Sequence, residues 1–159
     1  MIGRPYQIGI LVPDLKAALR RYSDLLGLGP WVRYVYGPGT ISDFTYRGRP
    51  AEFSIEIALT GQSPQIELIE VRGRPSLYHE WIDVHGYGLH HVGVEVGSAR
   101  AAIEEMAAAG YEVLQSGHGY GLDGDGGFAY FDTVQELGMI VEAIEIPKRR
   151  RPPDGVWPE

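Results

Sequence analysis

Two stretches of the chain decide the fold: "QIGILVPDLKAALRRYSDLLG" (residues 7–27) and "HVGVEVGSARAAIEEMAAAG" (residues 91–110). Each begins with a polar residue, a β-branched residue and a glycine. Three more strand-like residues follow, and then a segment of helical composition that contains Ala-Ala-Leu or Ala-Ala-Ile. When the stretches are aligned, Gln7 matches His91.

A second pair of similar stretches follows later in each half. These are "IELIEV" (residues 66–71) and "VEAIEI" (residues 141–146), in which Glu67 matches Glu142. Two matched blocks in the same order indicate an internal duplication.

Each half is predicted to begin with a strand and a helix. Residues 6–12 and 90–96 are short β-branched runs, whereas residues 14–26 and 98–109 carry apolar residues at helical spacing. Residues suited to start and end the two helices are Asp14, Ser98, Gly27 and Gly110. Further strands are expected in "WVRYVYG", "AEFSIEIAL" and "QIELIEV", and in "YEVLQ", "GFAYFDT" and "MIVEAIEI".

The pattern predicts an α+β fold in which two βαβββ units form one curved mixed sheet. We place the first unit at residues 1–74, a linking helix that Pro75 opens at 75–88 and the second unit at 89–147. Residues 148–159 form a basic, Pro-rich tail that we expect to be solvated.

Strand alternation predicts which side chains share a face. Gln7 lies on the same face as Gly9, and His91 on the same face as Gly93. A glycine inside a strand weakens it unless something must approach closely. The sequence therefore predicts an open space beside each polar residue. His90 is expected to precede the strand on the opposite face, as a structural or solvated residue.

The last strand of each unit carries two carboxylates on opposite faces. Alternation places Glu67 and Glu70 on different faces, and does the same for Glu142 and Glu145. Buried carboxylates are costly without a positive partner. The pattern leaves open whether Glu67 with Glu142, or Glu70 with Glu145, forms an inner pair.

Composition limits the classes of function. The chain has 159 residues, 44% of them hydrophobic, a net charge of −7 and no cysteine. The negative charge disfavours non-specific binding of nucleic acid. The absence of cysteine excludes disulfides and thiolate metal sites, and suits the cytoplasm. No apolar run approaches the roughly 18 residues of a membrane span, and the first residues lack the pattern of a signal peptide.

The chain resembles the vicinal oxygen chelate superfamily, which includes glyoxalases, bleomycin resistance proteins and methylmalonyl-CoA epimerases. The resemblance covers about residues 5–147 and rests on "QIGILVPDLKAALRRYSDLLGLGPW", "IELIE", "GLHHVGVEV" and "FAYFDTVQELGMIVEAIE". It implies a metal held by one residue early in the first strand of each unit and one residue in the last strand of each. The implied ligands are Gln7, Glu67, His91 and Glu142. Many relatives have histidine at the position of Gln7.

The ligand set suits proton abstraction next to a carbonyl group. Three oxygen ligands and one imidazole fit Zn, Ni, Co, Mn, Fe or Mg. A divalent ion stabilises charge on a carbonyl oxygen, and a carboxylate can then act as the base. The resemblance favours Glu142 as that base, with Glu67 as the alternative. His118 lies in the Gly-rich "SGHGYGLDGDGG", which we expect to be a loop over the site, so it is a third candidate.

We therefore expect a metal-dependent isomerase, epimerase or lyase that acts on a small, partly apolar, oxygenated molecule. A ligand-binding protein of the drug-sequestering type and an extradiol dioxygenase are the alternatives; Gln7 argues against the dioxygenase. A homodimer is expected because sheet edges at "YQIGILV" and "HHVGVEV" would need partners. Aromatic residues that could line a pocket are Trp31, Tyr34, Tyr36, Tyr46, Phe53, Tyr120 and Phe128.

Overall fold

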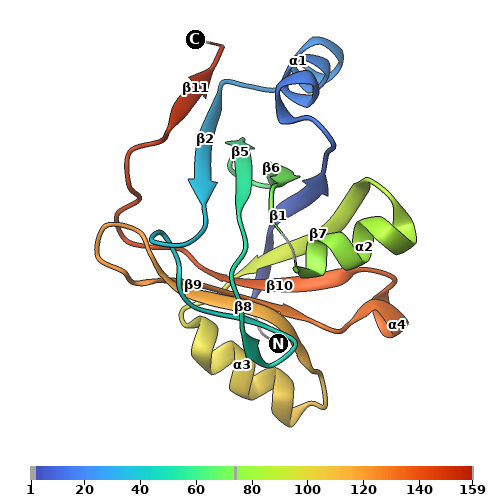
Figure 1. Cartoon of the computed structure of the whole chain (residues 1–159), viewed down its shortest axis with the longest axis vertical. Helices are drawn as coiled ribbons and strands as arrows, with labels where there is room; N and C mark the ends of the chain where they lie inside the picture. Colours follow the sequence, from blue (N-terminus) through green and yellow to red (C-terminus); the bar gives the residue numbers. More distant parts are fainter. Residues whose placement is uncertain (1–2, 74, 159) are drawn as a thin grey trace.

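The computed structural model describes residues 3–73 and 75–158 and forms one curved mixed sheet with helices on its faces (Figure 1). Within this part of the chain the strand order is β11-β2-β5-β6-β1-β7-β10-β9-β8-β3-β4. The sheet is not a closed barrel. The predicted α+β fold is confirmed.

The two predicted βαβββ units form the two halves of the sheet. The first contains β1 (Arg4–Leu11), α1 (Leu15–Leu26), β2 (Trp31–Tyr36), β5 (Ile55–Thr60) and β6 (Gln65–Val71). The second contains β7 (Gly88–Glu95), α3 (Ala99–Ala108), β8 (Val113–Tyr120), β9 (Gly126–Phe131) and β10 (Ile140–Glu145). The order β2-β5-β6-β1 in one half mirrors β8-β9-β10-β7 in the other, as expected for a duplication.

The first strands of the two units pair with each other at the centre of the sheet. β1 is antiparallel to β7, while β1 pairs in parallel with β6 and β7 in parallel with β10. The prediction that β1 and β7 are free edges is therefore wrong, because each strand has a neighbour on both sides. Unpaired edges of β1 and β7 are therefore no argument for a homodimer, which stays a prediction.

Each unit sends a segment to the outer strand of the other unit. The hairpin of β3 (Ser42–Tyr46) and β4 (Arg49–Pro50) belongs to the first half of the chain, but β3 pairs with β8. The C-terminal strand β11 (Gly155–Trp157) follows the second unit and pairs with β2. An outer strand has unpaired backbone groups that such a segment satisfies. The prediction of a solvated tail is therefore wrong.

The helices begin where the sequence indicates. Asp14 accepts a hydrogen bond from Ala17 N at 2.8 Å at the start of α1, and Ser98 accepts one from Ala101 N at 3.2 Å at the start of α3. Such caps satisfy backbone donors that have no partner within the helix. The linking helix is α2 (Leu77–His85), and a short α4 (Val134–Leu137) precedes β10.

The strand β8 is longer than predicted, because it continues through the Gly-rich stretch to Tyr120. His118 pairs with Ser42 of β3 on one side and with Gly127 of β9 on the other. The prediction of a loop around His118 is wrong, since pairing with two neighbouring strands holds Gly117 and His118 within β8.

The core divides between the two faces of the sheet. One large cluster combines inner-face residues of both units, such as Tyr34, Ile57, Phe128 and Ile140. Two smaller clusters lie under α1 and under α3 on the other face. The two units thus share one apolar interior, so the inner face of either unit alone would be exposed to water.

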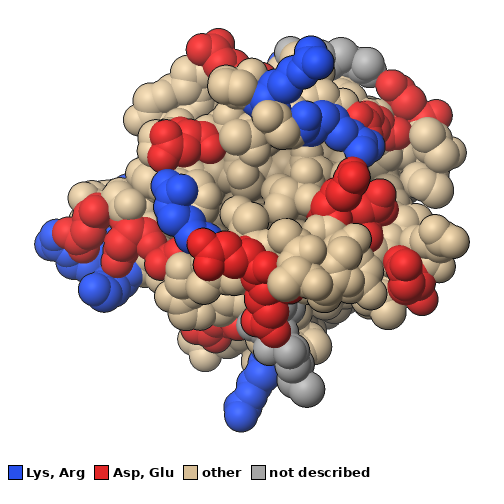
Figure 2. Space-filling model, turned by 90° about the horizontal axis from the view of Figure 1, so that it is seen from below, with Lys and Arg blue, Asp and Glu red and all other residues tan. Residues whose placement is uncertain are grey.

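The surface carries charges of both signs, and acidic and basic side chains are interspersed on the face in Figure 2. None of the helices in the described residues combines the length and apolar composition needed to cross a bilayer. The predicted cytoplasmic location stays a prediction.

Candidate metal centre

The four residues predicted as ligands lie on the four central strands, one on each. Gln7 is on β1, Glu67 on β6, His91 on β7 and Glu142 on β10. All four side chains are buried on the inner face. The strand alternation used to place Gln7 beside Gly9 and Leu11 holds, because these three residues are buried and their neighbours in β1 are more exposed.

Glu67, His91 and Glu142 form a compact group. His91 Nε2 lies 3.0 Å from Glu142 Oε2 and 3.4 Å from Glu67 Oε2. One ligand atom from each residue falls within 4.8 Å of the others. Imidazole nitrogen and carboxylate oxygen are common ligands of divalent metals. This buried group could therefore hold a metal ion.

The two glycines of the repeat, Gly9 and Gly93, make room for the polar side chains of the opposite strand. Gly9 faces His91 and Gly93 faces Gln7 in the antiparallel register. A Cβ atom added to Gly9 would overlap the imidazole ring of His91. The space predicted beside each polar residue is thus occupied by the polar residue of the other unit.

Gln7 lies beside this group and has one partner of its own. Its amide nitrogen donates a hydrogen bond to Gln65 Oε1 at 2.8 Å. This contact orients the amide and leaves its oxygen available for another partner. Gln7 lines the same cavity as Glu67 and Glu142.

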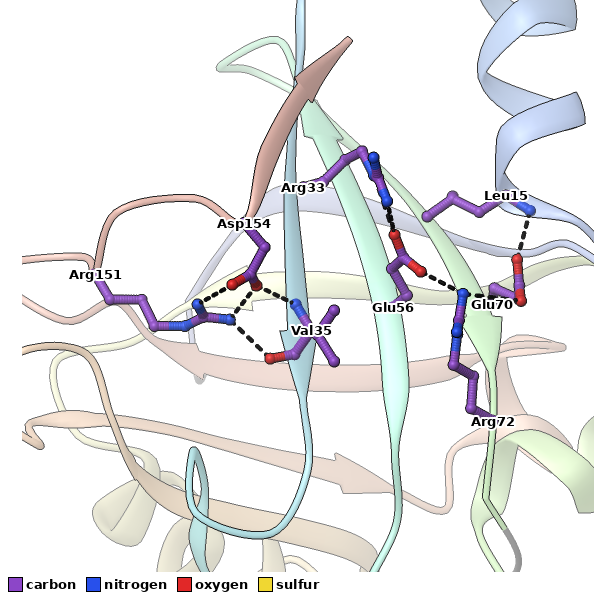
Figure 3. Close-up of polar contacts among 8 residues, drawn as sticks. All are labelled: Leu15, Arg33, Val35, Glu56, Glu70, Arg72, Arg151 and Asp154. Carbon is purple, nitrogen blue, oxygen red and sulfur yellow. Dashed lines mark hydrogen bonds and ion pairs between the residues drawn. The ribbon is translucent and has the colours of Figure 1, made fainter.

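The second pair of carboxylates has a different role. Glu70 Oε2 accepts a hydrogen bond from Leu15 N at 2.7 Å (Figure 3), and Glu145 Oε2 accepts one from Ala99 N at 2.9 Å. Leu15 and Ala99 are the first residues of α1 and α3, where backbone donors and the helix dipole favour a negative charge. Glu70 and Glu145 are therefore helix-stabilising residues on the outer face.

Burial and charge act together on the group. Burial disfavours the charged imidazolium, but the carboxylates of Glu142 and Glu67 outweigh it and raise the pKa of His91 to about 9. Burial raises the pKa of Glu67, although His91 opposes the rise. His91 Nε2 and Glu142 Oε2 form an ion pair at 3.0 Å, but neither atom makes a hydrogen bond of good geometry within the described residues. A cation at this point would satisfy both atoms, so the residues fit a metal ion.

His90 is also part of the inner cluster, contrary to the prediction. Its Nδ1 lies 2.9 Å from His91 Nδ1, and its side chain is fully buried. The physical reason is a bulge: Gly9 pairs with His91 and Ile10 with Leu89, so His90 is left between them and departs from strict alternation. Burial lowers the pKa of His90 well below 6.5, so this ring is neutral.

The two histidines therefore have defined hydrogen-bonding roles. If Nε2 of His91 offers its lone pair to a metal, Nδ1 carries the proton and donates it to His90 Nδ1. The rings of Tyr78, Trp81 and Tyr130 surround His90 with centroids within 5.7 Å. The adjacent "HH" was the only signal for this contact in the sequence.

Three of the metal-ligand candidates, Gln7, Glu67 and Glu142, line an apolar cavity of about 70 Å³. Its aromatic and aliphatic lining residues are Tyr36, Ile41, Phe53, Ile55, Ile57, Leu59, Tyr78, Tyr120, Phe128, Tyr130 and Ile144. Tyr36, Phe53, Tyr120 and Phe128 are among the aromatic residues that the sequence indicated. Arg150 also lines the cavity, and the sequence analysis had assigned it to a solvated tail.

His118 does not join the site. A Cβ atom added to Gly127 would lie 2.7 Å from His118 Nδ1 and 3.1 Å from Ala99 Cβ, so the imidazole is on the face covered by α3. His118 is absent from the residues that line the cavity. The prediction of His118 as a catalytic base is wrong for this geometric reason.

Three comparisons with known proteins agree with this description. Residues 6–131 match the model of the glyoxalase/bleomycin resistance protein/dioxygenase superfamily. Over 118 residues the chain is 31% identical to an ethylmalonyl-CoA/methylmalonyl-CoA epimerase of Cereibacter sphaeroides, which covers 74% of this chain and 78% of the epimerase.

Solved structures show the same fold. Methylmalonyl-CoA epimerase from Mycobacterium tuberculosis aligns with a TM-score of 0.63 at 20% identity, covering 92% of this chain and 91% of the epimerase. A hypothetical protein from Bacillus halodurans C-125 aligns with a TM-score of 0.67 at 22% identity, covering 93% of this chain and 97% of its own.

Proposed function

We propose that this chain, which belongs to the glyoxalase/bleomycin resistance protein/dioxygenase superfamily, is a metal-dependent epimerase or related isomerase that removes a proton next to a carbonyl group. The observation that carries the proposal is the buried Glu67–His91–Glu142 group at the base of an apolar cavity. Two of its polar atoms, His91 Nε2 and Glu142 Oε2, lie 3.0 Å apart as an ion pair but form no hydrogen bond of good geometry with any described residue.

We propose Gln7, Glu67, His91 and Glu142 as the ligands of one divalent ion. Gln7 lines the cavity, and the hydrogen bond from its amide nitrogen to Gln65 leaves the amide oxygen available to bind an ion. Zn, Ni, Co, Mn, Fe and Mg all accept a set of oxygen and imidazole ligands. Such an ion, when bound, supplies a Lewis acid that polarises a substrate carbonyl.

The proton acceptor is proposed to be Glu142, with Glu67 as the alternative. Tyrosines that line the cavity stay protonated near neutral pH, because burial raises the pKa of Tyr36 to about 12 and also raises the pKa values of Tyr78, Tyr120 and Tyr130. A neutral phenol is a poor base. Among the described lining residues, the carboxylates of Glu67 and Glu142 are then the groups that can act as a base. An epimerase must also return the proton to the opposite face, and two carboxylates from opposite units could share that work.

The substrate proposed for testing is a short, branched acyl thioester of coenzyme A. The relative from Cereibacter sphaeroides is named as an ethylmalonyl-CoA and methylmalonyl-CoA epimerase. The side chains of Ile55, Ile57 and Ile144 in the cavity suit a methyl or ethyl branch. A thioester carbonyl would present the oxygen that the chemistry requires.

The test is exchange of the α-hydrogen with solvent deuterium. Purified protein is dialysed, its metal content per chain is measured, and it is incubated with methylmalonyl-CoA or ethylmalonyl-CoA in deuterium oxide. We expect close to one divalent ion per chain and deuterium incorporation that stops after chelation and returns when metal is added.

Other outcomes would favour the alternatives. A protein without metal that binds an aromatic ligand but exchanges no hydrogen would be a sequestering protein. Oxygen consumption with a catechol would indicate a dioxygenase. A metal-loaded protein that exchanges the α-hydrogen of neither thioester would contradict the proposed substrate.

A further inference from the structure

The C-terminal segment crosses from the second unit to the first and passes the cavity on its way. It leaves β10 at residue 146 and ends in β11, which pairs with β2 (Figure 1). Backbone contacts hold its first part, since Leu122 N donates to Arg149 O at 2.9 Å. The segment is thus attached at both ends.

Arg151 anchors the middle of this segment. Its guanidinium donates to Val35 O at 2.7 Å and to both carboxylate oxygens of Asp154, at 2.9 and 2.6 Å (Figure 3). Asp154 in turn accepts a hydrogen bond from Val35 N at 2.7 Å. The guanidinium also lies over the rings of Tyr34 and Tyr36, at 5.2 and 5.3 Å from their centroids. These contacts restrain the backbone next to Arg150.

Arg150 itself lines the cavity and has no charged partner. Its side chain is partly buried, and within residues 3–73 and 75–158 it makes no hydrogen bond or ion pair. It is the one Lys or Arg among the described residues that line the cavity. Burial raises the pKa of Tyr36 and of Tyr120, and Arg150 opposes both rises, so its charge acts on the cavity.

The charge balance of the cavity then indicates an anion. The carboxylates of Glu67 and Glu142 would be balanced by one divalent ion. Arg150 adds a positive charge for which the protein offers no hydrogen-bonded partner. A partly buried guanidinium in an apolar setting favours a carboxylate, to which it can donate two parallel hydrogen bonds.

We propose that Arg150 is a specificity-determining residue that binds a carboxylate of the substrate while the neighbouring carbonyl oxygen lies at the metal centre. This inference rests on the proposed function. It assigns the substrates to acyl compounds with a second, anionic group close to the reacting carbon. The match to the family model ends at residue 131 and so does not include Arg150.

A competing role for Arg150 is to neutralise Glu67 and Glu142 from a distance. Arg150 does lower the pKa of Glu67, but burial and His91 have larger effects on that carboxyl. In the neutralising role Arg150 would weaken metal binding by repulsion, and its removal would strengthen it. In the substrate-binding role, removal of the Arg150 side chain would lower the affinity for an anionic ligand. The two roles therefore predict different measurements.

The test compares two probes that share one chelating group. Acetohydroxamate carries the hydroxamate alone, whereas malonohydroxamate carries the same group with a carboxylate one carbon away. Their dissociation constants are measured on zinc-loaded or nickel-loaded protein. We expect wild type to prefer malonohydroxamate, and Arg150→Gln to reduce that preference on the order of 10-fold to 100-fold. Arg150→Lys should keep part of it.

Arg149→Gln is the matched control. Arg149 is exposed, donates to Asp123 Oδ2 at 2.8 Å and does not line the cavity, so its replacement removes the same charge one residue away. It should leave the preference unchanged. Metal content and acetohydroxamate binding are measured for every variant.

The outcomes separate this inference from the proposed function. Equal preference in Arg150→Gln and Arg149→Gln, with metal and acetohydroxamate bound, would overturn the assignment of Arg150 alone. Weaker binding of free coenzyme A by Arg150→Gln, without a change in preference, would assign Arg150 to the phosphates and also overturn it. Wild-type protein that holds no metal would overturn the proposed function, and the assignment with it.

Discussion

The first unit (β1, α1, β2, β5, β6) and the second unit (β7, α3, β8, β9, β10) contribute equivalent strands to the sheet but unequal side chains to the candidate metal centre. The first places an amide, Gln7, where the second places an imidazole, His91. Their last strands both place a carboxylate, Glu67 or Glu142, on the inner face. A duplicated scaffold can therefore keep its geometry while the candidate ligand in the first strand differs in chemistry between the two units.

The two glycines show how far the equivalence extends. Both lie opposite the polar residue of the other unit, but their surroundings differ. A Cβ at Gly9 would overlap the His91 ring, whereas a Cβ at Gly93 would lie 2.5 Å from Ile144 Cδ1 and 3.1 Å from Gln7 Cβ. The larger imidazole makes the glycine of the first unit the more restrictive position.

The largest difference between the units is expected for their carboxylates. Glu142→Gln should reduce deuterium exchange on the order of 100-fold to 10,000-fold, because an amide keeps the oxygen ligand but removes the base. Glu67→Gln should have a smaller effect, since Glu142 is the proposed base and Glu67 the alternative. Exchange rates at equal metal content measure this. Equal, small losses in both variants would refute catalysis by either carboxylate.

The second largest difference is expected in metal affinity, between substitutions of the first-strand residues Gln7 and His91. His91→Ala is expected to lower metal affinity on the order of 100-fold or more, because it removes the nitrogen ligand and leaves the carboxylates to repel each other. Gln7→Ala removes a neutral oxygen and should lower metal affinity about 10-fold. Metal titration gives both values, with circular dichroism as the control for folding. Full metal occupancy in His91→Ala would show that the ion binds elsewhere.

The glycine comparison should give a smaller effect. Gly9→Ala should destabilise the protein by about 1–3 kcal/mol through overpacking and should displace His91 from its ligand position. Gly93→Ala should cost less, because the end of the Ile144 side chain can move. Urea denaturation and metal titration are the measurements. A greater loss of stability or metal affinity in Gly93→Ala than in Gly9→Ala would show that Gly93 is the more restrictive position.

The smallest effect is expected on the free energy of unfolding, from a change at Asp154, where the C-terminal segment joins the first unit. Arg151, and then the Val35 amide, lower the pKa of Asp154 to about 2 from an unfolded value of about 3.9. A depressed carboxyl pKa contributes stability above the unfolded pKa, and this contribution is lost as the pH falls from about 4 to about 2.

Because Asp154 is partly exposed, its contribution should be less than about 1 kcal/mol. Wild type should be more stable than Asp154→Asn at pH 5, and the difference should shrink toward pH 2.5. Urea denaturation over this pH range measures it. A difference that does not vary with pH would show that the carboxyl charge is not what anchors the tail.

From the sequence we could derive the duplication, the positions of the main helices and strands, and the placement of Glu67 and Glu70 on opposite faces of their strand. These features follow from local rules: apolar residues repeat with the period of a helix or strand, Asp14 and Ser98 cap helices, and alternation sends neighbouring side chains to opposite faces. Alternation could not choose between Glu67 and Glu70. The family resemblance made that choice, and the contact of Glu70 with the start of α1 agrees with it.

Only the tertiary structure decided the pairing of β1 with β7, the bulge that turns His90 inward, the outward direction of His118 and the arrival of Arg150 at the cavity. Each of these depends on which strand lies next to which. That choice is made by backbone hydrogen bonds between residues far apart in the chain, and the local pattern of side chains carries little information about it. The tail looked solvated for the same reason, because the strand that accepts it is more than 100 residues away.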